Sequence, residues 1–556
     1  MKTNIITTAI IALSAIIALN WGIHPQFNNG QEGKFSANRV AEDIKEISRH
    51  PHSITDDKER AEVRDYLHKR LEELGGNVQI FRYDSLQGAG FTFDAYNIYA
   101  EFPPAGKTGE ESYLMMIAHY DSRYRWILTG ETEVSHGAAD DGYGIGVILE
   151  TVRLASAYRD KWQQGIKVLF TDGEEVGMIG MKAAYSRNPE IFDNVGLAIN
   201  VESRGTYGPA LLFETSPKNN RLMQLYGSHA RFPYTYSLTN VVYKYMPNST
   251  DFAIIMDSIP GFNFATVADI NHYHTSLDRY ENISPQTILH YGRQITPIVE
   301  HYLTDTRYKE EKYLCGNEEN ISFTIPILGM LSFSKNGYIL LNVIITLLFI
   351  MLLVKEARKP AFTAKRLLTT LVTILAGATL ATATGMLTTW LCTKMSGVKF
   401  SLFGITAGIP YDNKAILLCL LAIATTTITL YTKWMRAATL HRPALLLHAT
   451  LLLQGISGIA LLATLGENMI FFVPFAATTA ATFLWSIKKW SIFPWMAIAV
   501  ISLHAFSFIY IVAMALTIGA LSAIALLTFL YCVNIAALAI MANNSKSPFK
   551  TTEQKH

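Results

Sequence analysis

Hydrophobic positions divide this chain into two parts. Up to about residue 310, short apolar segments alternate with charged ones, whereas from Gly337 onward long apolar runs are separated by short polar breaks. In the first part, apolar residues recur at helical spacing over 36–50, 56–74 and 142–158 and predict three helices. Short continuous apolar runs predict strands that are buried on both faces. These runs are 113–118, 167–170, 195–201 and 261–267, and alternating segments at 78–83 and 95–102 predict two further strands.

Strands that alternate with helices predict an α/β sandwich built around a mainly parallel sheet. The carboxyl ends of parallel strands meet at one edge of such a sheet, and ligands bind there. We therefore expect any functional residues of this part to follow the strands directly.

The apolar runs of the second part predict an all-α domain of about seven membrane spans, since about 20 residues suffice to cross a bilayer. The N-terminal segment 1–22 predicts a retained signal anchor, because no small-x-small cleavage site closes it, and this gives eight spans in all. The predicted spans are 337–354, 366–391, 413–432, 443–465, 468–487, 490–513 and 516–541.

Basic residues between the spans predict an orientation. Lys and Arg are concentrated in every second loop, as at 355–366, 433–442 and 488–489. Loops rich in Lys and Arg usually lie on the cytoplasmic side of the membrane. Only the loop with Lys394, Lys399 and Lys414 opposes this assignment. The soluble part is then extracytoplasmic: periplasmic or outside in a bacterium, lumenal in a eukaryote. The predicted organisation is an anchor at 1–22, a soluble domain at 30–310, a linker at 311–336, a membrane domain at 337–541 and a cytoplasmic tail at 542–556.

Charge and cysteine content narrow the partners. The net charge is +2, and no basic cluster lies outside the membrane-flanking loops, so the bilayer is a predicted partner and nucleic acid is not. The four cysteines form no CxxC pair, which predicts neither a zinc knuckle nor a disulfide framework. A metal would have to use His, Asp and Glu. The sequence makes no prediction about oligomeric state.

Candidate ligands follow the predicted strands in a fixed order. The segment Asp172-Gly173-Glu174-Glu175 comes after the strand at 167–170, and crowded carboxylates repel one another unless a cation or shared protons compensate. Taken alone, this segment fits a solvated acidic turn as well as half of a metal site. The other candidates are His119-Tyr120-Asp121-Ser122, Asp140-Asp141 within Gly137–Gly144, Glu202, and His274 within Asn271–Ser276.

Together the motifs HYDS, GAADDGYG, FTDGEEVG and YHTS resemble the M28 zinc metallopeptidases over residues 36–305. With the multispan region, the chain is similar to the membrane-bound branch that includes endoplasmic reticulum metallopeptidase-like proteins. The resemblance implies an aminopeptidase-like three-layer sandwich with a mostly parallel mixed sheet and two zinc ions. It also implies the roles of individual residues: His119 and Glu202 on one zinc, Glu175 and His274 on the other, Asp140 (or its neighbour Asp141) bridging both, Asp121 orienting His119, and Glu174 as general base.

The chemistry agrees with this division. Zinc accepts imidazole and carboxylate ligands and keeps an open position for water in catalytic sites. Two ions about 3.5–4 Å apart need a bridging anion. The resemblance and this chemistry together predict a membrane-anchored di-zinc exopeptidase, with an aminopeptidase as the preferred type. It would cleave peptides with a metal-bridging water and with Glu174 as the base. The family often has aspartate at the position of Glu202. The alternatives are a glutaminyl cyclase-like transferase with one zinc and a non-catalytic receptor or scaffold.

Overall fold

The computed structural model describes residues 2–23, 33–106, 111–124, 134–244, 249–400, 409, 412–436 and 442–545. Two compact units make up the chain. One contains Gly22–Thr324 and Gly329–Lys335, and the other contains Met1–Trp21, Ile325–Leu328 and Asn336–His556. Residues 546–556 of the predicted tail lie outside the described residues.

A seven-stranded mixed sheet forms the centre of the first unit, in the order β1-β2-β4-β3-β5-β7-β6. The four inner strands β4, β3, β5 and β7 are parallel, whereas β1, β2 and β6 pair antiparallel at the two sides. The strands are β1 (Asn77–Gly88), β2 (Phe91–Phe102), β3 (Tyr113–His119), β4 (Gly165–Thr171), β5 (Val195–Ser203), β6 (Leu211–Thr215) and β7 (Gly261–Thr266).

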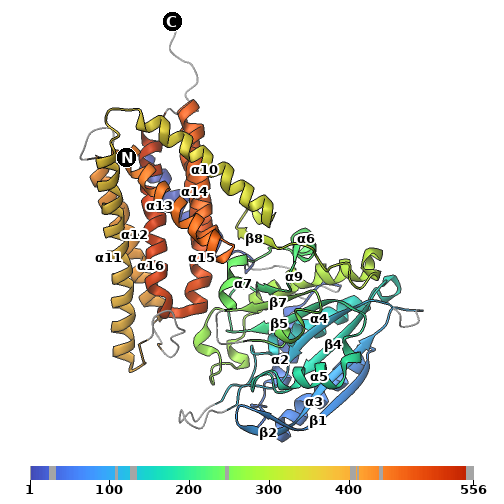
Figure 1. Ribbon diagram of the computed structural model, residues 1–556. Helices are drawn as coiled ribbons and strands as arrows, with labels where there is room; N and C mark the ends of the chain where they lie inside the picture. The colour runs from blue at the N-terminus through green and yellow to red at the C-terminus, as the bar shows by residue number, and fades with distance from the viewer. Residues whose placement is uncertain are drawn as a thin grey trace. The chain divides into compact units, whose positions relative to one another are not determined.

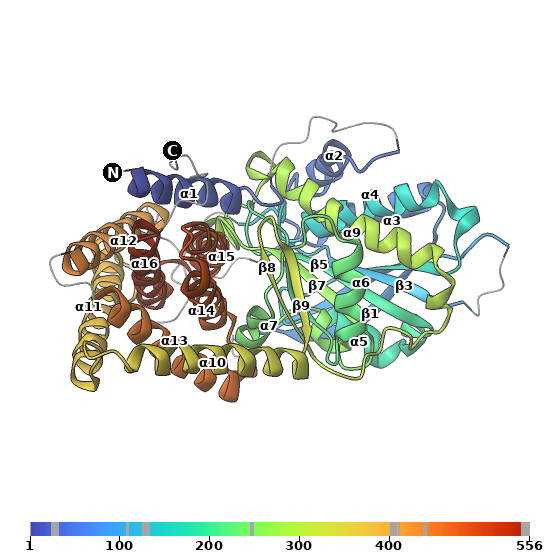
Figure 2. The same ribbon diagram turned by 90° about the horizontal axis from the view of Figure 1, so that it is seen from above.

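Helices cover both faces of this sheet. Along β3, Leu114 and Met116 pack into a core with α2, α4 and α9, while Met115 and Ile117 pack on the opposite face with α5 and α8. Figure 2 shows α4 and α9 on one side of the strands and α5 on the other. The helices are α2 (Ala37–Ile47), α3 (Asp57–Glu73), α4 (Gly142–Ser156), α5 (Ile179–Arg187), α6 (Asn220–His229), α7 (Ser237–Tyr243), α8 (Phe252–Ile255) and α9 (Pro285–Thr304). The predicted three-layer α/β sandwich is confirmed.

The segment predicted as a linker, 311–336, contains regular structure. Strands β8 (Asn320–Ile325) and β9 (Gly329–Ser334) form a two-stranded sheet there. Apolar Ile321, Phe323 and Ile325 alternate with polar residues along β8, and the three apolar side chains are buried. The strand is buried on both faces, because Ser322 and Thr324 between them are also buried, and their hydroxyls donate to Asn320 and to the carbonyl of Pro233.

The second unit is helical. Six stretches of the described residues are long and apolar enough to cross a membrane, and the last of these, Ile492–Asn543, contains two helices separated by the 3-10 turn Thr517–Ala520. Figure 1 shows these two, α15 and α16, side by side, and α1 packs against α15. The predicted multispan helical domain is confirmed. Its helices are α1 (Lys2–Leu19), α10 (Lys335–Ala357), α11 (Ala364–Ser396), α12 (Asp412–Arg436), α13 (Arg442–Leu465), α14 (Met469–Lys488), α15 (Ile492–Leu516) and α16 (Leu521–Asn543).

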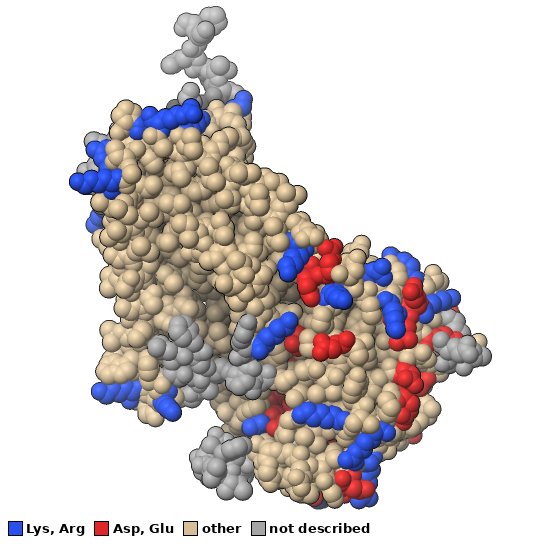
Figure 3. Space-filling view, viewed as in Figure 1, with Lys and Arg blue, Asp and Glu red and all other residues tan. Residues whose placement is uncertain are grey.

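The surfaces of the two units differ as their sequences do. In Figure 3, the face of the helical unit is largely free of charge between basic residues at its ends, whereas charges of both signs cover the α/β unit. Large apolar side chains such as Leu340, Leu347 and Leu380 are exposed on the helical unit. An exposed apolar belt of this kind is what a lipid-facing surface requires.

Candidate metal centre

Five predicted ligands meet at the carboxyl edge of the sheet. His119 is the last residue of β3, Glu175 follows β4, and Glu202 is near the end of β5. Because β4 and β5 both pair parallel with β3, these three positions share one edge. Asp140 comes just before α4, and His274 follows the 3-10 turn Ile270–His272. The peptide bond between Asp140 and Asp141 is cis.

His119, Asp140 and Glu202 form the first group that could hold a metal ion. His119 Nε2 lies 3.2 Å from Asp140 Oδ1 and 3.7 Å from Glu202 Oε2. All three side chains are buried. A buried pair of carboxylates costs free energy unless positive charge accompanies it, so the group suits a cation.

Asp140, Glu175 and His274 form the second group. His274 Nε2 lies 3.3 Å from Asp140 Oδ2 and 3.1 Å from Glu175 Oε1. Each of these three buried atoms lacks a hydrogen-bond partner within the described part of the chain. Three converging atoms that can each ligate a metal, and that make no hydrogen bond, fit a metal ion better than a hydrogen-bonded cluster. The two oxygens of Asp140 therefore face the two groups separately.

Asp121 orients His119 and the acidic turn together. Its backbone carbonyl accepts a hydrogen bond from His119 Nδ1 at 2.9 Å, which leaves Nε2 directed at the first group. Its carboxylate lies 3.6 Å from Nδ1 and accepts hydrogen bonds from the backbone amides of Glu174 at 3.0 Å and Glu175 at 3.2 Å. The predicted orienting role thus belongs to the carbonyl, while the carboxylate holds the turn.

The three acids after β4, Asp172, Glu174 and Glu175, have different surroundings. Asp172 lies away from the ligands, where Arg60 Nη1 contacts both of its oxygens at 3.2 Å. Glu175 accepts from Arg123 Nη1 at 3.0 Å. For Glu174, burial raises the pKa well above its usual value; His119 opposes this, and the charges of nearby carboxylates add to it. Glu174 is thus the acid of this turn with the strongest tendency to hold a proton.

The pKa values of the two histidines are also raised in the absence of metal. Burial lowers the pKa of His119, but hydrogen bonds to Asp121 and Asp140 and the charge of Glu202 raise it well above its usual value. Burial also lowers the pKa of His274, while Glu175 and Asp140 raise it to about 9. A proton therefore takes the place that a metal cation would occupy.

Asp141 caps helix α4. Its Oδ1 accepts from the backbone N–H of Gly144 at 3.0 Å and caps α4, which is why Asp140 rather than Asp141 faces both groups. Glycine is required at 144, because a Cβ atom there would lie 2.3 Å from Asp141 Oδ2 and 2.5 Å from the carbonyl oxygen of Val201.

Three residues near the ligands had no signal in the sequence. Arg123 holds the backbone carbonyl and the carboxylate of Glu175. Asp278 accepts from the backbone amides of Ala139 at 2.7 Å and Asp140 at 3.4 Å, and burial followed by the charge of Asp140 raises its pKa to about 7. Asp251 accepts from the Thr171 hydroxyl. Each is a single residue that lies outside the four motifs, although Arg123 directly follows HYDS and Asp278 lies two residues after YHTS.

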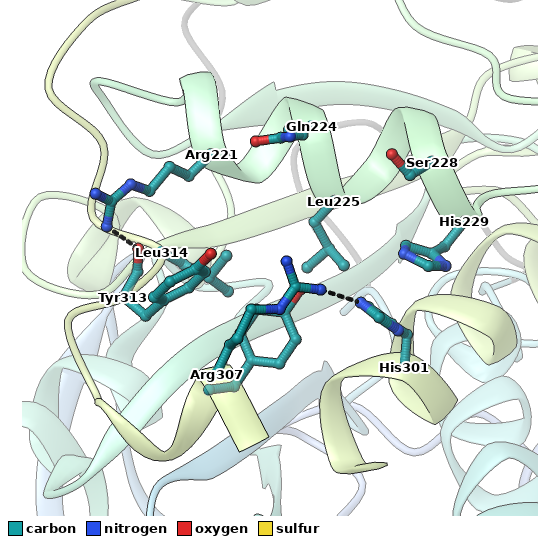
Figure 4. Close-up of a pocket in the computed structure, with 10 residues that line it drawn as sticks. Arg221, Gln224, Leu225, Ser228, His229, His301, Arg307, Tyr313 and Leu314 are labelled. Carbon is teal, nitrogen blue, oxygen red and sulfur yellow. Dashed lines mark hydrogen bonds between the residues drawn. The ribbon is translucent and has the colours of Figure 1, made fainter. Parts of the chain in front are cut away.

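A cavity of about 150 Å³ lies elsewhere in this unit and includes none of these residues. Figure 4 shows it between α6, the end of α9 and the segment that follows, with Arg307 bonded to His301 and Arg221 to the Tyr313 carbonyl. His229 and His301 stack at 3.7 Å between ring centroids. The cavity is a separate feature of the surface.

The mixed sheet and two His/carboxylate groups that share an aspartate define a metallopeptidase-type domain. Residues 97–299 match the model of peptidase family M28. The chain therefore carries a domain of peptidase family M28, as predicted.

Relatives place it with the membrane-bound branch. The chain is 26% identical over 300 residues to "Endoplasmic reticulum metallopeptidase 1" of Mus musculus, covering 53% of this chain and 32% of that protein. It is 24% identical over 320 residues to "Vacuolar membrane protease" of Candida albicans, covering 56% and 36%. It thus spans about a third of these relatives' length. A crystal structure of Porphyromonas gingivalis glutaminyl cyclase matches with 20% identity and a TM-score of 0.39, covering 48% of this chain and 99% of that one.

Proposed function

We propose that this chain is a membrane-anchored exopeptidase, specifically an aminopeptidase, that holds two zinc ions and cleaves peptides on the extracytoplasmic side. The observation that carries the proposal is the position of Asp140. Its Oδ1 faces His119 and its Oδ2 faces His274, at 3.2 and 3.3 Å. A carboxylate with one oxygen toward each of two ligand groups has the geometry of a metal bridge.

Zinc fits both groups. Each group offers one imidazole nitrogen and two carboxylates, which are ligands that zinc prefers, and three protein ligands leave a position open in a catalytic site. When bound, two zinc ions would act as Lewis acids and make a water molecule more acidic. Arg123 and Asp121 fix Glu175 and His119, so the ligands are held before a metal arrives.

Glu174 is the proposed proton carrier. Its backbone amide is fixed by Asp121, and it has no ion pair within the described residues. In the proposed reaction, a Glu174 carboxylate oxygen accepts a proton from the attacking water and delivers it to the amine that leaves. Its raised pKa suits a group that must both accept and release a proton.

The extracytoplasmic location is supported by the charge pattern of the loops, with Lys and Arg concentrated in every second one. The family match to M28 and the membrane-protein names of the relatives support the anchored peptidase. Peptides are the proposed substrates and the bilayer is the proposed support.

The experiment is Glu174→Gln, with metal analysis and a screen of aminoacyl and N-terminally blocked peptides. Loss of the proton carrier should reduce kcat by about 10²–10⁴-fold while zinc stays at two ions per chain. Glu190→Gln, which changes an exposed glutamate of the same unit, should leave both values at wild-type level. Undiminished turnover by Glu174→Gln would contradict the proton-carrier role. One ion per chain would instead favour the glutaminyl cyclase-like reaction.

A further inference from the structure

Arg204 lies beside the proposed ligands and has no ion pair within the described part of the chain. It directly follows β5, two residues after Glu202, and its backbone N–H still bonds to the carbonyl of Thr266 in β7 at 2.8 Å. Residues two apart in an extended segment point to the same face, so Arg204 and Glu202 project from the same face of the sheet.

The guanidinium of Arg204 lies near Tyr273, the neighbour of the proposed ligand His274. Its Cζ lies 5.8 Å from the ring centroid of Tyr273, and that ring stacks on His274 with centroids 3.6 Å apart. Arg204 Nε is buried and lacks a hydrogen-bond partner. Arg60 and Arg123, by contrast, are paired with Asp172 and Glu175. An unpaired, buried guanidinium N–H costs free energy unless a ligand accepts its hydrogen bond.

Tyr243, at the end of α7, supplies a second free donor. Its hydroxyl is buried and has no hydrogen-bond partner among the described residues, while its ring packs on Phe213 with centroids 4.8 Å apart. Burial raises the pKa of Tyr243, the charges of Glu214, Glu202 and Glu174 raise it further, and Arg204 lowers it. The phenol is therefore a neutral donor in the electrostatic range of both the proposed base and Arg204.

We infer that Arg204, assisted by Tyr243, binds a carboxylate of the substrate on the leaving-group side of the cleaved bond. This inference rests on the proposed function and specifies its substrate class: short peptides that present a carboxylate next to the cleaved bond. A planar guanidinium matches a carboxylate with two parallel hydrogen bonds. Consecutive Cα atoms are about 3.8 Å apart, so a carboxylate on the first residue after the cleaved bond lies close to that bond, on the side that we assign to Arg204.

Two sources could supply that carboxylate: the free C-terminus of a dipeptide or an acidic side chain. Three probes separate them, namely leucyl-alanine, leucyl-alanine amide and leucyl-glutamic acid α-amide. Binding is measured by calorimetry on the zinc-loaded Glu174→Gln protein, so that no probe is consumed. We expect one carboxylate probe, or both, to bind about 10- to 100-fold more tightly than leucyl-alanine amide. The probe that does so identifies the source.

Arg204→Met in the same background should remove that difference, and Arg204→Lys should keep part of it, because lysine retains the charge without the fork. Arg231→Met changes an exposed arginine of the same unit and should keep the full difference. Equal binding of all three probes with Arg204 present, or a difference that persists in Arg204→Met, would overturn the inference.

The same preparations separate this inference from the proposed function. Hydrolysis by the protein with Glu174 intact, together with equal binding of all three probes, would refute the carboxylate site and leave the peptidase in place. The opposite result is preferential binding of a carboxylate probe that Arg204→Met abolishes, without hydrolysis of any peptide. That result would support the carboxylate site and refute the proposed peptidase function.

Discussion

Replacing Asp121 with asparagine tests whether one carboxylate positions both the proposed base and a proposed ligand. The side chain is fully buried, and its two oxygens accept separate hydrogen bonds from the amides of Glu174 and Glu175, at 3.0 and 3.2 Å. Asparagine keeps the shape but offers a single oxygen, so its NH₂ group faces one of the two backbone donors. The backbone carbonyl that orients His119 is unchanged.

The magnitude follows from these two bonds. Leaving one buried amide without an acceptor costs about 1–3 kcal/mol, and the remaining bond loses its charge assistance, about 1 kcal/mol more. We therefore expect Asp121→Asn to lower the free energy of unfolding by about 2–4 kcal/mol. A shift of the turn by about 1 Å is enough to reduce kcat/KM by about 10²-fold.

The assay combines denaturant unfolding, zinc content and kcat/KM per folded molecule. Asp43→Asn is the matched control, because Asp43 is also buried and accepts from Tyr66 and from Arg70 at 2.8 Å, within the α2–α3 layer. It should lower stability while leaving kcat/KM unchanged. If Asp121→Asn matched the wild-type kcat/KM, or differed from it no more than Asp43→Asn does, the positioning argument would be refuted.

Three further outcomes are expected. Gly144→Ala should lower the free energy of unfolding by at least about 1–3 kcal/mol, because its Cβ would lie 2.3 Å from Asp141 Oδ2; an equally stable variant in denaturant titration would contradict the close approach. Asp278→Ala should weaken zinc retention against a chelator, because the amide of Asp140 and its neighbour lose their acceptor, and unchanged retention would exclude this support. Zinc binding near pH 7.5 should release protons, because His274 has a pKa of about 9 without metal and must be neutral to bind one. Calorimetry in buffers of different ionisation enthalpy measures this release, and a buffer-independent heat would contradict it.

The sheet could be predicted from the sequence where its strands are buried on both faces. The short, largely apolar segments at β3 and β4, 7 residues each, are too short for a buried helix and favour a buried strand. The strand at 78–83 was predicted too short, since β1 continues to Gly88 beyond a register shift between Tyr83 and Leu86. Irregular pairing of this kind depends on the partner strand β2, which local pattern does not report.

The candidate site likewise contains residues that the sequence predicts and residues that only the structure reveals. His119, Asp140 and Glu202 come at strand or helix ends and belong to recognisable motifs, so their order along the chain predicts where they meet. Arg123 and Asp278 act through contacts with residues 52 and 138 or 139 positions away. No periodicity connects such pairs, and only the folded chain shows them.

The turn after β4 shows how neighbouring acids acquire different chemistry. Arg60 offsets the charge of Asp172, and Arg123 with His274 offsets that of Glu175, at 3.0 and 3.1 Å. Glu174 has no such cation within the described residues, so burial and the adjacent carboxylates act on it with less compensation. A ligand must stay ionised and a proton carrier must change its charge. The placement of two arginines therefore helps to separate these roles within the four positions 172–175. Exchanging Glu174 with Glu175 in the assignment would put the acid that is paired with Arg123 in the role that requires proton exchange.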